Sequence, residues 1–250
     1  MKRKLIMGGL LTLSLALTGC SNSGTTSGVA KDNKTPNEEK KTDKKENLQS
    51  PTIQEESIKV YKSPYDDNVN EFSYSAIIKN EGEDLLRIYP YTLTVHKKDG
   101  TVADTVPAFV TPMYLRPGDQ AYVSAYGPIN GLDETNYNKT TTNIDYQKTN
   151  KELLLLKPEK VLFQKPQGEI DSVGKVTGIL LNETGKLAKD IEISAAMFDK
   201  EGKLLLTTQG YANNDLNDKE SEGFSLDIYS SKEVLDQVVT VDVKAQGFIE

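Results

Sequence analysis

The chain has very few of the side chains on which metal and redox sites are built. Its 250 residues include one cysteine, one histidine and no tryptophan. A single cysteine excludes an internal disulfide, a thiolate zinc site and an iron–sulfur cluster. Any Ser–His–acid triad would have to be built on His96. We therefore expect neither a cofactor nor an enzymatic activity.

Basic residues are also in the minority. Acidic side chains outnumber basic ones by 37 to 30, and the net charge is −7. Because phosphate backbones are bound by net basic surfaces, this balance disfavours a nucleic-acid partner. Only three of the basic residues are arginine, a lysine bias that is typical of AT-rich genomes and favours a Gram-positive host.

The first 20 residues have the features of a secretory signal. Three basic residues precede an apolar stretch, residues 5–17, which is shorter than the roughly 20 residues needed to span a bilayer. The run Leu17-Thr18-Gly19-Cys20 resembles the lipobox of bacterial lipoproteins. The resemblance implies that residues 1–19 are a removed signal peptide and that Cys20 carries diacylglyceryl and N-acyl chains. Because two or three acyl chains anchor stably, we expect a cell-membrane protein that faces the extracytoplasmic side.

Residues 20–56 carry almost no large apolar side chains and are rich in Ser, Thr, Asn, Lys and Glu. The lysine pairs at positions 40–41 and 44–45 are neutralised by neighbouring acidic residues, so they do not form a basic patch. Such a segment cannot bury enough surface to offset its conformational entropy. We interpret it as a disordered tether between the anchor and the folded part.

The rest of the chain repeats itself with an offset of 102 residues. Between residues 64 and 102 the offset produces seven identities, against about two expected by chance. Among them are Asn80 with Asn182 and Gly100 with Gly202. Two copies of one module follow from this repeat.

Both copies have the pattern of antiparallel strands with one buried face. Apolar residues alternate with other residues over 89–95 and over the corresponding stretch 191–197. Each stretch runs into a turn that contains Gly100 or Gly202, where glycine permits the positive φ of a tight hairpin. The expected fold class is all-β, with two tandem immunoglobulin-like antiparallel β-sandwiches.

The repeat also predicts the domain limits. We expect the first module at residues 57–157 and the second at 158–250. This boundary is set to within about five residues, because residues 159–165 fit either the end of one module or the start of the next. An Asn/Thr-rich segment, residues 131–150, is interpreted as an insertion that the second module lacks.

Helix signals are few. Residues 149–152 and 230–233 both fit a capping box, in which a hydroxyl caps the first turn and a glutamate reaches back. After the first box, Pro158 limits any helix to two turns. We therefore expect two short helices at most.

One strand of the second module resembles a known family. Residues 182–185, the strand ending at Asp199 and then Gly202 resemble an FxLYD-type domain, a bacterial extracytoplasmic β-sandwich. Asp199 matches the end of the motif, whereas Ala195, Met197 and Phe198 replace its Phe, Leu and Tyr. The first module departs further from the pattern. The resemblance implies an envelope lipoprotein or secreted module and carries no catalytic residues.

Little in the sequence suggests chemistry. His96 is the only imidazole, and Phe198 takes its place in the second module, so we expect it to pack or to face solvent. A surface hydrolase using His96 is the least favoured hypothesis. One acidic turn offers several oxygen ligands for calcium, although a solvated turn is the better interpretation. Its weak candidate residues are Asp215, Asn217, Asp218 and Glu220.

Tyrosines are distributed unevenly. Ten of the 12 lie between residues 61 and 146. Six of them align with apolar residues of the second module and are predicted core positions; these are Tyr61, Tyr74, Tyr89, Tyr91, Tyr122 and Tyr126. Four remain as candidate ligand-binding residues, since tyrosine offers a large contact area at low entropic cost. These are Tyr65, Tyr114, Tyr137 and Tyr146.

Together these features predict a lipid-anchored protein of the cell envelope that binds a protein or a glycan without catalysis. Two alternatives stay open. One is capture of a solute or cation by the acidic turn, and the other is a purely structural spacer in the envelope.

Overall fold

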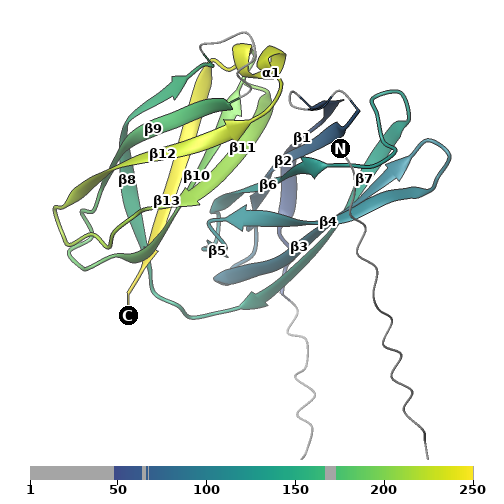
Figure 1. Cartoon of the computed structure of the whole chain (residues 1–250). Helices are drawn as coiled ribbons and strands as arrows, with labels where there is room; N and C mark the ends of the chain where they lie inside the picture. Colours follow the sequence, from purple (N-terminus) through teal and green to yellow (C-terminus); the bar gives the residue numbers. More distant parts are fainter. Residues whose placement is uncertain (1–47, 64–65, 67, 167–172, 250) are drawn as a thin grey trace, which may run out of the picture. The chain divides into compact units, whose positions relative to one another are not determined.

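The computed structural model describes residues 48–63, 66, 68–166 and 173–249 (Figure 1). The predicted signal peptide, the predicted lipidation site Cys20, most of the predicted tether and Tyr65 lie outside the described residues. Residues 48–250 belong to one compact unit.

The first sheet has seven strands, and every pairing in it is antiparallel. Their hydrogen-bonded order is β1-β2-β6-β4-β3-β5, and β7 pairs with the other edge of β3. The strands are β1 (Thr52–Lys62), β2 (Asn70–Lys79), β3 (Leu86–Lys97), β4 (Val102–Thr111), β5 (Tyr114–Leu115), β6 (Gln120–Pro128) and β7 (Tyr137–Lys148).

The second sheet has six antiparallel strands in the order β11-β10-β13-β8-β9-β12. They are β8 (Leu153–Gln164), β9 (Val173–Leu181), β10 (Lys189–Phe198), β11 (Leu204–Tyr211), β12 (Ser221–Tyr229) and β13 (Thr240–Phe248). The described residues contain one helix, α1 (Lys232–Asp236), and none that is long and apolar enough to cross a membrane. The all-β prediction is confirmed.

Each sheet folds over around its own apolar core. In the first sheet β4 pairs with β3 up to Ala108 and with β6 from Phe109 onward, so one strand belongs to both halves. Tyr74 of β2 and Tyr91 of β3 meet inside the core with ring centroids 6.3 Å apart, although β2 and β3 are not paired. Alternation places Leu93 and Val95 in the same core, as the sequence predicts.

The second sheet folds over at a different strand. The first four residues of β8, Leu153–Leu156, pair with β13, and the remainder pairs with β9. Within the pairing with β9 the register shifts between Glu159 and Leu162, and Lys160 has a φ of 51° there. Leu154 and Leu156 enter the second core, while Leu155 between them is exposed.

The 102-residue offset relates the two sheets strand by strand. The corresponding strands are β1 and β8, β2 and β9, β3 and β10, β4 and β11, β6 and β12, and β7 and β13. Gly100 and Gly202 have φ angles of 87° and 79°, and each closes a turn with the same backbone hydrogen bond from its N–H to the residue three positions earlier. The repeated sequence therefore builds a repeated structure.

This correspondence corrects the predicted insertion. Residues 131–150 contain β7, which pairs with β3 just as β13 pairs with β10. The segment therefore contains a strand, β7, whose counterpart in the second sheet is β13. Its Asn/Thr-rich sequence reads as a loop because β7 lies at an edge and its side chains are exposed or half-buried.

The predicted tether extends too far, because β1 begins at Thr52. β8 begins at Leu153, which is within five residues of the predicted boundary at 157. The predicted helix after residues 149–152 is the start of β8, because burying Leu154 and Leu156 requires the alternation of a strand. The second predicted helix forms as α1 after Ser231, but without a side-chain cap hydrogen bond.

A third, smaller apolar cluster joins the two sheets. Ile77 and Tyr122 of the first sheet pack with Ala196, Leu204 and Phe198 of the second. Buried hydrogen bonds surround this contact. The Thr207 N–H donates to Ser75 Oγ at 2.8 Å, and the Thr207 hydroxyl donates to the Val123 carbonyl at 2.6 Å.

Candidate functional site

A cleft of about 350 Å³ lies between the outer face of the first sheet and strands β11 and β12 of the second. We call it the inter-sheet cleft. The lining residues that matter for its chemistry are Ser73, Phe109, Ser124 and Tyr126 of the first sheet, with Thr208, Gln209, Asp227 and Tyr229 of the second. Both sheets are needed to form it.

An aromatic pair forms one wall of the cleft. The rings of Tyr126 and Tyr229 are stacked, with centroids 6.0 Å apart and planes at 25°. Their side chains are 65% and 44% exposed, and Phe109 on the lining is 57% exposed. Three large aromatic side chains held at one concave surface are typical of a recognition surface.

Polar groups line the second-sheet side of the cleft. The Thr208 hydroxyl donates to the Asp227 carbonyl at 2.8 Å, which ties β11 to β12. The Thr111 hydroxyl donates to Gln209 Oε1 at 2.5 Å, so this amide is held from the first sheet. These bonds fix the orientation of the polar side chains before any ligand arrives.

The electrostatics of the cleft are simple. Among the described lining residues Asp227 is the only charged side chain, and its carboxylate forms an ion pair with Lys175 Nζ at 3.3 Å. No lysine or arginine is part of the described lining. The arrangement can accept hydrogen bonds and stack on rings, but it offers no cation to an anionic ligand.

Tyr114, a predicted binding residue, lies at a different contact between the sheets. It belongs to β5, and its ring meets Phe248 of β13 edge-on with centroids 5.3 Å apart. Lys151 Nζ lies 5.2 Å from the Tyr114 ring centroid and 3.8 Å from that of Phe248. The contact therefore holds the sheets together through aromatic and cation–π interactions.

Tyr137 and Tyr146, the other two described candidates, lie on β7 and pack at the edge of the first core. The Tyr137 and Thr140 hydroxyls are 3.3 Å apart, and the Tyr146 hydroxyl donates to the Leu48 carbonyl at 3.4 Å. Burial raises the pKa of Tyr137. The structure does not bring these residues to Tyr114, which lies on the opposite side of β3.

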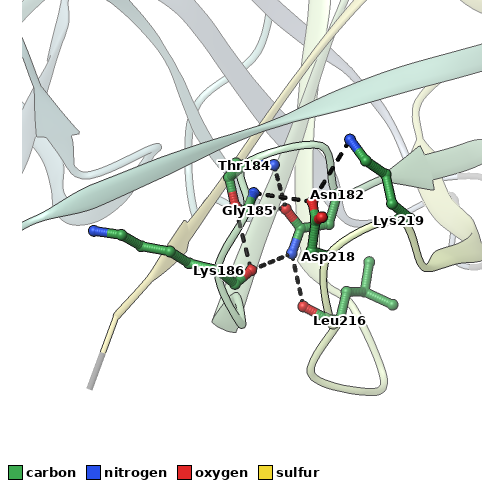
Figure 2. A network of polar contacts seen from close by, with 7 residues as sticks. All are labelled: Asn182, Thr184, Gly185, Lys186, Leu216, Asp218 and Lys219. Carbon is green, nitrogen blue, oxygen red and sulfur yellow. Dashed lines mark hydrogen bonds and ion pairs between the residues drawn. The ribbon is translucent and has the colours of Figure 1, made fainter.

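The acidic turn is occupied by its own hydrogen bonds. Asp218 Oδ1 accepts the Gly185 N–H at 2.9 Å, and Glu220 Oε2 accepts both the N–H and the side-chain amide of Asn217 (Figure 2 for Asp218). Asp215 is exposed. Among the described residues no group of three or more acidic, histidine or cysteine side chains could hold a metal ion.

The centre of this network is Asn182, as Figure 2 shows. Its side-chain amide donates to the Lys186 and Leu216 carbonyls, both at 2.7 Å, and its Oδ1 accepts the Thr184 N–H at 3.0 Å. Asn80 makes the corresponding bonds in the first sheet, to Asp84, Leu115 and Gly82. The repeated asparagine is therefore a structural residue that ties two loops together.

His96 is also accounted for locally. Its Nε2 lies 3.1 Å from the Thr141 hydroxyl on the neighbouring strand β7. It is not part of the inter-sheet cleft.

The first core contains a buried polar cluster. The Tyr74 and Tyr91 hydroxyls are 3.0 Å apart, and the Tyr74 hydroxyl donates to Glu56 Oε2 at 3.3 Å. Burial raises the pKa of both tyrosines, so they stay neutral. The cluster satisfies hydroxyl groups inside the core, as buried tyrosines require.

Sequence reasoning missed Tyr126 because its alignment slips by one residue. Leu115 pairs with Leu86, and Leu216 pairs with Ala188, so after this point the true offset is one less than 102. Tyr126 thus corresponds to Asp227, which faces outward, and not to the buried Ile228. A shift of one residue exchanges the two faces of a strand.

Of the other predicted core tyrosines, only Tyr122 lies beyond this slip. Tyr74 and Tyr91 are buried in the first core as predicted, whereas Tyr122 is buried against the second sheet and Tyr61 is half-buried. Tyr89 is 64% exposed and lies in a bulge of β3, where the register with β7 shifts between Ile88 and Tyr91. Aligning Leu115 with Leu216, the leucines that precede the turns before β6 and β12, could have identified the outward face of Tyr126.

Comparison with models of known protein families and with curated proteins found no match to this chain. The resemblance of residues 182–202 to FxLYD-type domains and that of residues 17–20 to a lipobox therefore stay predictions.

Proposed function

We propose that the chain is a lipid-anchored protein on the extracytoplasmic face of a bacterial cell membrane. It binds an envelope component in the inter-sheet cleft without transforming it. The lipobox-like run ending at Cys20 supports the anchor, since acyl chains supply the membrane affinity that an acidic protein of net charge −7 lacks.

The body of the protein, in this proposal, consists of two immunoglobulin-like β-sandwich modules. Two separate cores and the strand-by-strand repeat support this assignment. The second module is of the FxLYD type. Binding sites on such scaffolds sit where rigid strands present side chains to a common surface.

The observation that carries the binding function is the stacked pair of Tyr126 and Tyr229 in a cleft. Leaving large aromatic side chains exposed has no benefit for a structural spacer, because their burial would stabilise the fold. Catalysis is not proposed, because the described lining offers one carboxylate, Asp227, which is already paired with Lys175.

A site-specific crosslinking experiment tests the binding function. A photo-crosslinking amino acid replaces Phe109 in the full chain, expressed in its host, and captured envelope material is identified by mass spectrometry. We expect one dominant adduct that is lost in the Tyr126→Ala/Tyr229→Ala variant. Tyr211→Ala is the matched control, since Tyr211 is 70% exposed on β11 but does not line the cleft.

The anchor is tested separately. Inhibition of the lipoprotein signal peptidase should leave a larger, uncleaved precursor, and Cys20→Ala should abolish the incorporation of radiolabelled palmitate. Unchanged size under the inhibitor, or palmitate incorporated without Cys20, would contradict the anchor. An adduct that persists in the double tyrosine variant would contradict binding in the cleft.

A further inference from the structure

We propose that the ligand class of the inter-sheet cleft is a neutral saccharide, one or two sugar units of a glycan chain. This inference rests on the proposed binding function and adds the chemistry of the ligand. It follows from the size, the aromatic surface, the polar groups and the charge of the cleft, in that order.

The size of the cleft favours a small ring-shaped ligand. About 350 Å³ is near the lower end of the range of roughly 300–1,000 Å³ that is typical of small-molecule sites. The cleft holds a short segment of a polymer and not a folded protein surface.

The aromatic side chains match one face of a sugar ring. A pyranose presents axial C–H bonds on its flat face, and the face of an aromatic ring carries partial negative charge that attracts them. Tyr126 and Tyr229 are stacked on each other and remain about half or more exposed, and Phe109 adds a third ring on the lining.

The polar side chains match the hydroxyl rim of the same ring. Each sugar hydroxyl donates and accepts, and the lining supplies hydroxyl groups from Ser73 and Ser124, the Gln209 amide and the Asp227 carboxylate. The Asp227 carboxylate and the Gln209 amide discriminate between hydroxyl positions, because a sugar that leaves either group without a hydrogen bond binds less tightly.

The charge of the cleft argues against an anionic polymer. The described lining contains the negative Asp227 and no positive side chain. Lys175 neutralises Asp227 but is not part of the described lining, so phosphate- or carboxylate-bearing chains would lose hydration without gaining an ion pair in the site. Neutral sugars carry no such cost.

A peptide is the main competing ligand, and the backbone of the cleft disfavours it. The Thr207 N–H on β11 already donates to Ser75 Oγ, and the Asp227 carbonyl on β12 already accepts from Thr208. Strand addition needs free backbone groups along an edge. Two backbone groups that an added peptide strand would need on β11 and β12 are therefore already bonded, whereas a saccharide uses the side chains of the cleft.

The test uses the full mature chain in a detergent without a sugar headgroup, because a glycosidic detergent would compete. The probes are neutral oligosaccharides of glucose, galactose and N-acetylglucosamine, and a parallel array of proline-rich and other extended peptides. The chain has no tryptophan and 12 tyrosines, so ligand stacking is read directly from tyrosine fluorescence.

We expect saturable binding of at least one neutral oligosaccharide, weakened more than tenfold by Tyr126→Ala and by Tyr229→Ala. Tyr211→Ala should bind as the unmodified chain does. Asp227→Asn provides a second variant that leaves the aromatic wall intact, and it should change which sugar is preferred. Melting curves of each variant verify that it is folded.

Three results would overturn the saccharide assignment. They are sugar binding that survives both tyrosine substitutions, binding of peptides alone, and binding of neither probe while crosslinking at Phe109 still captures a partner. The last two leave the proposed binding function standing with another ligand. Loss of both the crosslink and sugar binding would remove both proposals.

Discussion

The two sheets use corresponding strands but fold over at different ones. In the first sheet β4 pairs with strands of both halves, and in the second sheet β8 does so. Loops and turns are repeated much more closely, since Asn80 and Asn182 make matching hydrogen bonds and Gly100 and Gly202 close matching turns. The turns and loops are therefore the same in the two copies of the repeat, whereas the strand that links the two halves of each sheet is different.

The outward faces of two corresponding strands have diverged further. On β6 this face carries Tyr122 and Tyr126, and on β12 the corresponding residues are Gly223 and Asp227. Tyr122 is buried against the second sheet, whereas Gly223 is exposed. On β6 this face packs against the second sheet through Tyr122, and on β12 Tyr229 of this face stacks on Tyr126 at the cleft.

Removing the repeated asparagine should have the largest effect on stability. We expect Asn80→Ala and Asn182→Ala each to cost roughly 2–4 kcal/mol, because buried carbonyl groups lose their donors. Asn182→Ala should cost about 1 kcal/mol more, because Asn182 Oδ1 also accepts the Thr184 hydroxyl at 2.6 Å, where the first sheet has Gly82. Urea unfolding of the full chain measures both values.

Thr184→Ala serves as the control for this comparison. It removes the extra hydroxyl, and it should account for most of the difference between the two asparagine variants. If the two asparagine substitutions cost the same although Thr184→Ala is costly, the other hydrogen bonds of Asn182 must contribute less than those of Asn80. The two networks would then differ in energy.

A smaller effect is expected at a cross-strand pair that the two sheets fill differently. Ala76 faces Val123 in the first sheet, and Gly178 faces Phe224 at the corresponding place in the second. A Cβ at Gly178 would lie 2.6 Å from Phe224 Cε1 and 3.1 Å from the Glu159 carbonyl oxygen. Gly178→Ala should therefore destabilise by about 1–3 kcal/mol through overpacking.

The double variant Gly178→Ala/Phe224→Val recreates the pair of the first sheet. It should be more stable than the sum of the two single effects by at least about 1 kcal/mol, since the two side chains share one volume. Additive effects in this double-mutant cycle would mean that the side chains at positions 178 and 224 do not compete for the same space.

Periodicity and turn residues predicted most strands and the repeat, because each depends on neighbours in the sequence. β7 was missed even though Ile144 and Tyr146 alternate with exposed residues, because Asn and Thr at an edge strand resemble a loop. The run from Leu153 was taken for a helix because a short apolar run does not distinguish helix from strand. The face on which Tyr126 lies could not be predicted without the correct offset for β6, which is one residue less than the offset of 102 found before Leu115.

The cleft was beyond the reach of the sequence for a different reason. It depends on the packing of two sheets through residues such as Thr207 and Ser75, which are far apart in the chain and have no distinguishing motif. Aromatic residues could be counted, but their placement followed from a long-range contact. Tyr229 therefore received no role until its neighbour Tyr126 was placed.

Breaking the contact between the sheets tests whether they unfold together. Thr207→Val keeps the shape of the side chain but leaves the buried Val123 carbonyl without its 2.6 Å hydrogen bond. We expect a loss of about 1–2 kcal/mol in a single unfolding transition, followed by calorimetry. Thr105→Val on exposed β4 should change stability by less than about 0.5 kcal/mol. Two separate transitions would show that the sheets are thermodynamically independent.

The smallest expected effect is a pH dependence at the same contact. Glu192 of β10 is buried and its Oε2 accepts the Met113 N–H of the first sheet at 3.2 Å, whereas the corresponding residue of β3 is the exposed Pro90. Burial raises the pKa of Glu192, an effect that the Met113 N–H and Lys151 oppose and Asp190 reinforces. The folded chain therefore retains a proton that the unfolded chain releases.

It follows that Glu192 withdraws stability as the pH rises from its ordinary pKa of 4.5 through its raised value in the folded chain. Below pH 4.5 the carboxyl is protonated in both states and the penalty disappears. We expect Glu192→Gln, whose amide oxygen can still accept the Met113 N–H, to melt at a higher temperature than the unmodified chain at neutral pH. The difference should shrink as the pH falls toward 4.5, and taking this difference cancels the other titrating groups. A constant difference across this range, or a variant that melts lower at neutral pH, would mean that the carboxylate is stabilised by its partners more than burial penalises it.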